Sequence, residues 1–215
     1  QASRNLARIQ GHIPKEIHEE FNYLATLINI RNKHLNAAQE AIVVAAKGSV
    51  YEPYLGFNLA VTQLANDQQE QAQINLERVI QYARRHAAEE FAVLADRAKQ
   101  ALAHISIEDN DLLAAWQQLQ SVRTTGLYSN RALLSYGWTA IKLNQFKQAI
   151  PALKALNKRS ISIAEVQEAK VLLAHLYEQK GATRSALKHY LLAEKALDGG
   201  LSSIKSARKV IAGQR

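Results

Sequence analysis

The chain has no cysteine, no methionine, only 3 Pro and only 9 Gly among its 215 residues. The lack of cysteine excludes disulfides, thiol nucleophiles and thiolate-bound metals, and it fits an oxidising compartment as well as a reducing one. The lack of methionine, even at position 1, predicts a processed form or a piece of a longer protein. No apolar run reaches the length of a membrane-spanning helix, so no membrane span is expected in this chain.

What remains is rich in residues that favour helices. Ala, Leu, Gln, Glu, Lys and Arg lose little conformational freedom in a helix, and they dominate the chain. Apolar residues make up 47% of the sequence, which is enough to bury a sizeable core. The composition therefore predicts an all-α protein.

Motifs for catalysis, metals and cofactors are missing. His18 is followed by Glu19 and Glu20, but a zinc-binding helix needs a second His four residues on, and position 22 is Asn. No Gly-rich phosphate loop or Ser nucleophile elbow is present. The adjacent pairs Glu19–Glu20 and Glu89–Glu90 point to different faces of a helix, so neither can act as an acid–base pair. We expect no catalytic residues, no metal, no cofactor and no enzymatic activity.

Small residues recur at a fixed interval in four segments of the chain. A second small residue follows a first one twelve positions later, in the pairs Ala25/Ala37, Ala60/Ala72, Gly137/Ala149 and Ala174/Ala186. Two antiparallel helices joined by a short turn pack closely only where neither carries a bulky side chain. A turn-forming residue lies about midway in each segment, namely Asn32, Asp67, Asn144 and Gly181. The pattern predicts helix pairs, with Ala37, Ala72, Ala149 and Ala186 buried where the helices cross.

A fifth pair fills the gap between the second and third of these segments. Its small residues are Ala95 and Ala115, which lie twenty positions apart, so we expect about eight extra residues around 104–111, in the turn region. Its first helix is expected to be longer by one or two turns. Asp111 precedes an apolar-periodic run and marks the start of the second helix.

The repeat of about 34 residues resembles the tetratricopeptide repeat, a helix–turn–helix unit. The resemblance covers residues 18–199 and implies a right-handed α-solenoid of about five antiparallel helix pairs, at about 18–51, 53–86, 88–128, 130–163 and 167–199. Second helices should begin near Leu35, Gln68, Asp111, Gln145 and Thr183.

Both ends of the array are expected to be capped. Residues 1–17 form an N-terminal segment, and residues 200–215 are expected to form a short basic capping helix after a break at Gly199–Gly200. The last two repeats also resemble those of bacterial cell-envelope members of the family, which favours a periplasmic or cell-envelope location.

The resemblance implies a scaffold or adaptor that holds a protein or peptide in a groove lined by the first helices. The groove positions are expected three residues before and one after each first-helix small residue. The predicted partner-binding residues are Asn22, Phe57, Leu134, Trp138, Val171 and His175, together with Tyr54, which lies three residues before Phe57 on the same helix face. Aromatic residues at such places are typical of binding hot spots, although Trp138 and Phe57 could equally pack between repeats. Trp116, on a second helix, is expected in the core.

The alternative function follows from charge. The net charge is +8, and residues 150–215 hold 12 Lys and Arg against 5 Asp and Glu. Lys205, Arg208 and Lys209 could therefore bind nucleic acid or another polyanion, or could simply be a solvated helix face. Because no aromatic residue accompanies these charges and the groove positions are mostly apolar, a protein partner is favoured over nucleic acid. The sequence does not indicate an oligomeric state.

Overall fold

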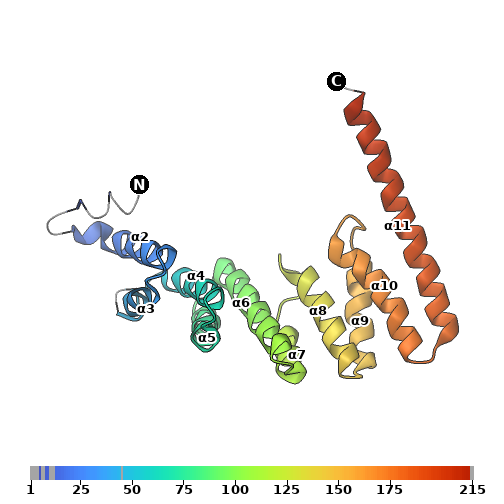
Figure 1. Ribbon diagram of the computed structural model, residues 1–215, viewed down its shortest axis with the longest axis horizontal. Coiled ribbons are helices and arrows are strands. Elements are labelled where there is room, and N and C mark those ends of the chain that lie inside the picture. Colours follow the sequence, from blue (N-terminus) through green and yellow to red (C-terminus); the bar gives the residue numbers. More distant parts are fainter. Residues whose placement is uncertain (1–4, 6–7, 10–12, 45, 214–215) are drawn as a thin grey trace. The chain divides into compact units, whose positions relative to one another are not determined.

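The computed structural model describes residues 5, 8–9, 13–44 and 46–213, so most of the predicted N-terminal segment lies outside the described residues. Within them, all regular structure is helical and no strand occurs. A short 3-10 helix, Lys15–Ile17, is followed by ten α-helices (Figure 1). Their bounds are α2 (His18–Arg31), α3 (Leu35–Val44), α4 (Glu52–Leu64), α5 (Gln69–Arg85), α6 (Glu89–Glu108), α7 (Leu112–Gln120), α8 (Ser129–Lys142), α9 (Phe146–Asn157), α10 (Ala164–Gln179) and α11 (Thr183–Ala212).

The chain divides into two compact units, residues 1–105 and 106–215, with the boundary in the last turn of α6. In the first unit, α2 packs against α3 and α4 against α5. In the second unit, α8 packs against α9 and α10 against α11, and α10 also packs on α8 and α9. The core of the second unit is built from Leu, Val and Ala side chains, with Leu153, Leu156 and Val166 fully buried.

Every turn between the two helices of a predicted pair has the same backbone structure. One residue in each turn has a positive φ, and these residues are Lys33, Asp67, Asn110, Asn144 and Gly181. The N–H of the next residue donates to the carbonyl five positions back along the chain, at 2.7–2.9 Å, as in His34 N–H to Asn29 O and Gln145 N–H to Ala140 O. This is the Schellman arrangement, which satisfies the free carbonyls at the end of a helix. The repeated turn makes the repeats equivalent in structure even where their sequences differ.

An alanine follows each of these turn residues by five positions. The five alanines, all almost completely buried, are Ala38, Ala72, Ala115, Ala149 and Ala186. Each donates its N–H to the residue that follows the turn residue, for example Ala149 to Gln145 O at 3.1 Å. The predicted starts of the second helices are confirmed, because α3 and α11 begin at the expected residue and α5, α7 and α9 one residue later.

The predicted register of the first pair is wrong by one residue. Ala37 is exposed, and Ala38 is the buried residue. The turn residue with positive φ is Lys33 and not Asn32. Because Asn adopts this conformation far more readily than Lys, the sequence alone favours the wrong position.

The predicted turn insertion of the third pair is also wrong. Ala103, which is 1% exposed, lies twelve positions before Ala115, so the usual interval is kept. The additional residues lie inside α6, which has 20 residues. The expected lengthening of the first helix is therefore confirmed. Ala95 and Ala103 are both small and buried, and it is Ala103 that occupies the repeat position of the first helix.

The C-terminal segment is not a separate capping helix. α11 continues without a break through Gly199 and Gly200 to Ala212, and it extends past α10 (Figure 1). A glycine inside a helix costs only about 1 kcal/mol relative to alanine, so two glycines need not end it. Residues 201–213 are all exposed, so this segment covers no described part of the core.

Candidate functional site

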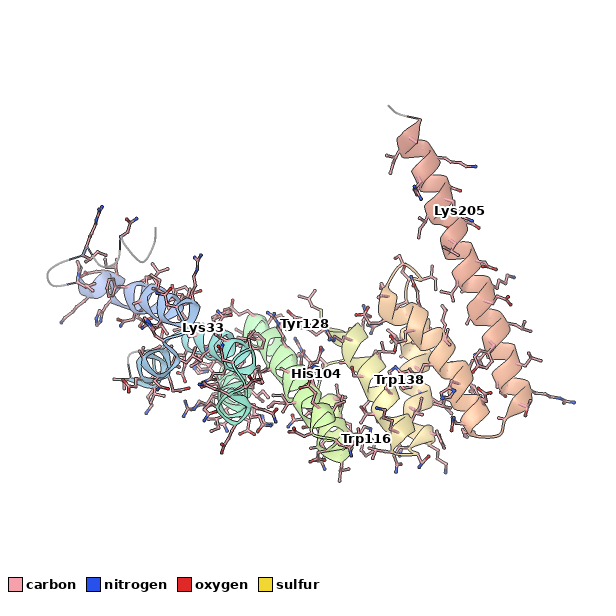
Figure 2. The ribbon with its side chains drawn as sticks, in the orientation of Figure 1. Lys33, His104, Trp116, Tyr128, Trp138 and Lys205 are labelled. Atoms are coloured by element: carbon pink, nitrogen blue, oxygen red, sulfur yellow. The ribbon has the colours of Figure 1, made fainter. Side chains whose placement is uncertain are left out.

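Trp138 is a large aromatic side chain at the surface of α8 (Figure 2). It is 38% exposed, and its indole Nε1 donates to Oε1 of Glu168 on α10 at 2.6 Å. A hydrogen bond to a charged acceptor holds the ring against α10 while part of the side chain remains open to solvent. A rigid exposed indole of this kind is a typical anchor for a partner protein.

The local sequence explains why Trp138 points outward. The preceding residue, Gly137, is buried, and a Cβ there would come within 2.6 Å of Leu153 on α9. The absence of a side chain lets α8 and α9 approach closely at this point. Trp138 is the next residue, about 100° further around the helix, and it therefore leaves the crossing.

On α10, residues at intervals of three and four form an outward row. Glu168, Val171, His175 and Glu178 are exposed or half-buried, whereas Val166, Ala169, Leu172, Leu173 and Leu176 are buried. Val171 is 43% exposed, and His175 Nδ1 lies 3.6 Å from Oε2 of Glu178. The row continues the surface that begins at Trp138.

Tyr190 on α11 completes this surface. Its hydroxyl donates to Oε2 of Glu178 at 2.7 Å, and this hydrogen bond raises the pKa of Tyr190. Next to it, α10 and α11 form a mostly apolar hollow lined by Val171, Tyr190, Leu191, Ala193, Glu194, Leu197 and Asp198. We call the surface formed by Trp138, Glu168, Val171, His175, Glu178 and Tyr190 the Trp138 face.

Two predicted groove residues lie in the cores of the units. Phe57 is 5% exposed, with the Arg97 guanidinium 4.6 Å above its ring, and Leu134 is 8% exposed in the core of the second unit. Their expected place in a groove is therefore wrong. The residue three positions before the small residue of a first helix faces the next first helix where one is present. For Leu134 on α8, that neighbour is α10. Val171 holds the same repeat position in α10, and it stays exposed because no described pair follows.

Asn22 and Tyr54 belong to the first unit and are half-buried. The Asn22 carbonyl accepts a hydrogen bond from Thr26 Oγ1 at 2.7 Å. The Tyr54 ring lies 6.1 Å from that of Phe91, and burial together with Glu90 raises the pKa of Tyr54. Only Trp138, Val171 and His175 of the predicted residues are brought together on one face.

Sequence reasoning missed Glu168, Glu178 and Tyr190. Glu168 and Glu178 could have been found, because each is spaced three residues from Val171 or His175 along the same helix face. Tyr190 lies on a second helix, where the groove was not expected. Trp116 is half-buried, and its ring stacks on Tyr136 with centroids 6.0 Å apart, beside the core of the second unit.

The basic residues of the alternative site lie elsewhere. Lys205, Arg208 and Lys209 are exposed on the protruding end of α11, where Figure 2 labels Lys205. Among the described residues, no group of three or more His, Asp and Glu side chains could hold a metal ion. None of the described helices has the length and apolar character needed to cross a membrane.

Comparison with known proteins identifies the fold through structure alone. No family model matches the sequence, and no curated protein matches it. Solved structures do match. The apo form of RapI superposes with a TM-score of 0.65 at 15% identity, over 92% of this chain but only 58% of RapI. MamA AMB-1 gives 0.60 at 15% identity, over 86% of this chain and 94% of that one. Repeats named TPR-like, from a kinesin light chain of Podosopora anserina, give 0.56 at 13% identity, over 89% and 100% of the two chains.

The chain has the fold of a tetratricopeptide-repeat solenoid. The all-α solenoid expected from the repeats is confirmed. In a tetratricopeptide-repeat fold each helix pair packs on the next, so the successive first helices lie next to one another. In the second unit these first helices are α8 and α10, which carry Trp138, Val171 and His175.

Proposed function

We propose that this protein is a non-catalytic interaction module that binds a peptide or a partner protein on the Trp138 face. The observation that carries the proposal is the exposed indole of Trp138, fixed to Glu168 of the next first helix by a 2.6 Å hydrogen bond. A side chain that is already held in place loses little conformational entropy on binding, which favours affinity.

The surroundings of Trp138 support a protein ligand. Val171 is an exposed aliphatic side chain on the adjacent helix, and His175 and Tyr190 extend the surface with groups that are part apolar and part polar. Interface centres are enriched in such aromatic side chains. The carboxylates of Glu168 and Glu178 are close by and can orient a partner by hydrogen bonding.

The ligand we expect is an amphipathic helix or an extended segment with apolar anchors. Trp138 and Val171 would contact its apolar side chains, while the surrounding polar groups would fix its register. The fold supports this proposal because solenoids of this kind present extended surfaces to proteins.

Selection of peptides from a displayed random library on the purified protein tests the proposal. Calorimetric titration of the selected peptides should then show that Trp138→Ala weakens binding by about 30-fold or more, since hot-spot truncation costs about 2 kcal/mol or more. The helical circular dichroism signal should stay unchanged, because Trp138 is exposed.

Two control variants separate this surface from others. Leu127→Ala removes an even more exposed apolar side chain, 83% exposed and outside the Trp138 face, and should leave the affinity unchanged. Neutralisation of Lys205, Arg208 and Lys209 should also have little effect. Selected peptides that bind the Trp138→Ala protein as tightly as the unaltered one would refute the proposed site, and loss of binding in the lysine and arginine variants would favour the basic end of α11.

A further inference from the structure

One face of α11 is apolar along most of the helix and exposed. Residues spaced alternately by three and four form a row that we call the α11 stripe: Leu187, Tyr190, Glu194, Leu197, Leu201, Ile204, Arg208 and Ile211. Leu201 is 54% exposed and Ile204 58% exposed, and none of the eight residues is buried. Spacing of this kind is the seam along which two helices pack.

The stripe has two halves with different surroundings. In the first half, Tyr190, Glu194 and Leu197 help to line the hollow between α10 and α11. In the second half, from Leu201 onward, the described residues of α11 are all exposed. The first half therefore borders a hollow in which another helix could bind. The second half is a solvent-exposed helix with an apolar side.

The charged residues that line the hollow are acidic, although Arg184, Lys188 and Lys195 also lie on the first half of α11, and the charged residues of the second half are basic. Glu194 and Asp198 are the acidic residues next to the hollow. Residues 201–215 hold Lys205, Arg208, Lys209 and Arg215 and no acidic residue. A parallel pair of α11 helices would place these cations against one another, whereas an antiparallel pair would place cations against carboxylates.

A two-fold axis at Leu201 makes the match specific. Glu194 lies seven residues before Leu201 and Arg208 seven residues after it, so each would face the other across the axis. Asp198 lies three residues before Leu201, so it would face the helical turn of the other copy that contains Ile204 and Lys205. The apolar side chains of the free half would then enter the hollow of the other copy beside Leu197.

We propose that two copies of this chain associate through antiparallel α11 helices, with the free half of each helix seated between α10 and α11 of the other. The contact is isologous, because the same stripe serves both copies. It goes beyond the proposed function because the ligand is a second copy of the chain, although its hollow shares Val171 and Tyr190 with the Trp138 face. An anionic lipid surface could attract the same cations, but it would also face Glu194 and Asp198, which it repels.

Sedimentation velocity at increasing protein concentration tests the association by charge reversal. The unaltered chain should form a dimer. Glu194→Lys with Asp198→Lys should be monomeric, and so should Lys205→Glu with Arg208→Glu, because each variant opposes like charges. An equimolar mixture of the two variants should restore the dimer, because both contacts of the mixed pair become complementary. All four positions are exposed, so the helical signal should not change.

A cysteine placed at the axis gives an independent measurement, because the natural chain contains none. Leu201→Cys should form a disulfide-linked dimer on mild oxidation, whereas Leu127→Cys should not. A chain that stays monomeric at every concentration would overturn the proposal, as would a dimer that survives both charge reversals or fails to link through residue 201. Binding of the monomer to vesicles of phosphatidylglycerol, without dimerisation, would assign the basic half to a lipid surface instead.

Discussion

Gly137 of α8 packs directly onto Leu153 of α9, with no room between them for a side chain on residue 137. A Cβ on Gly137 would lie 2.6 Å from Cδ2 and 2.9 Å from Cγ of Leu153. Leu153 is fully buried, so it has little freedom to move away. This contact fixes the crossing of the two helices and thereby the outward position of Trp138.

Gly137→Ala should therefore destabilise the protein by about 1–3 kcal/mol through overpacking, despite the higher helix propensity of alanine. Gly56→Ala is the matched control, because its Cβ would meet Val79 Cγ2 at an ordinary 3.5 Å. That control should stabilise the protein by about 0.5–1 kcal/mol. Urea unfolding of both variants measures the difference, and a Gly137→Ala protein as stable as the Gly56→Ala one would show that the crossing is looser than described.

The residue at the first turn gives a second prediction. Lys33 has a φ of 62°, a conformation that costs a side chain with a Cβ but not glycine. Lys33→Gly should raise the free energy of unfolding by about 1 kcal/mol. Lys142→Gly, in the last turn of α8 with helical backbone, should lower it by about 1 kcal/mol. If both lysines responded alike to glycine, the positive φ at residue 33 would be disproved.

The register of the first helix pair can be measured with two neighbouring alanines. Ala38 is fully buried and Ala37 is exposed. Ala38→Leu should cost about 1–3 kcal/mol through overpacking, whereas Ala37→Leu should change stability by no more than about 0.5 kcal/mol. A larger loss at Ala37 in thermal unfolding would restore the register read from the sequence.

The sequence predicted the helix pairs best where the turn residue itself favours the backbone conformation of the turn. Asp67, Asn144 and Gly181 favour the positive φ that their turns require, and the helix pairs around them were placed to within a residue. Lys33 has no such preference, so the turn residue and the buried alanine of the first pair are predicted one residue too early. In α6, Ala95 and Ala103 are both small and buried, and only the backbone of the turn shows which one belongs to the repeat.

The candidate site was less predictable for a physical reason. Whether a position on a first helix is exposed depends on the next pair, as the buried Leu134 and the exposed Val171 show at equivalent repeat positions. The sequence of one repeat carries little information about that neighbour. The continuity of α11 through Gly199 and Gly200 was missed because two glycines weaken a helix without ending it.

His189 predicts a dependence of stability on pH. Its ring stacks on Tyr177 with centroids 4.9 Å apart, and burial together with Lys154 and Lys188 lowers its pKa from 6.5. The folded state therefore binds the proton less readily than the unfolded state does. Stability should be full above pH 6.5 and should fall as the pH drops from there toward the lowered pKa. Urea titrations at several pH values should show that His189→Gln loses part of this fall.

The most direct test of the Trp138 face uses the fluorescence of single-tryptophan proteins, since the chain has only 2 Trp. Trp116→Phe leaves Trp138 as the sole tryptophan, and Trp138→Phe leaves Trp116. Addition of a selected peptide should shift the emission of the Trp116→Phe protein to shorter wavelength, because the exposed indole of Trp138 becomes buried. The emission of the Trp138→Phe protein should stay where it is. A peptide that binds the Trp116→Phe protein by calorimetry, yet leaves the emission of Trp138 unchanged, would contradict binding at this face.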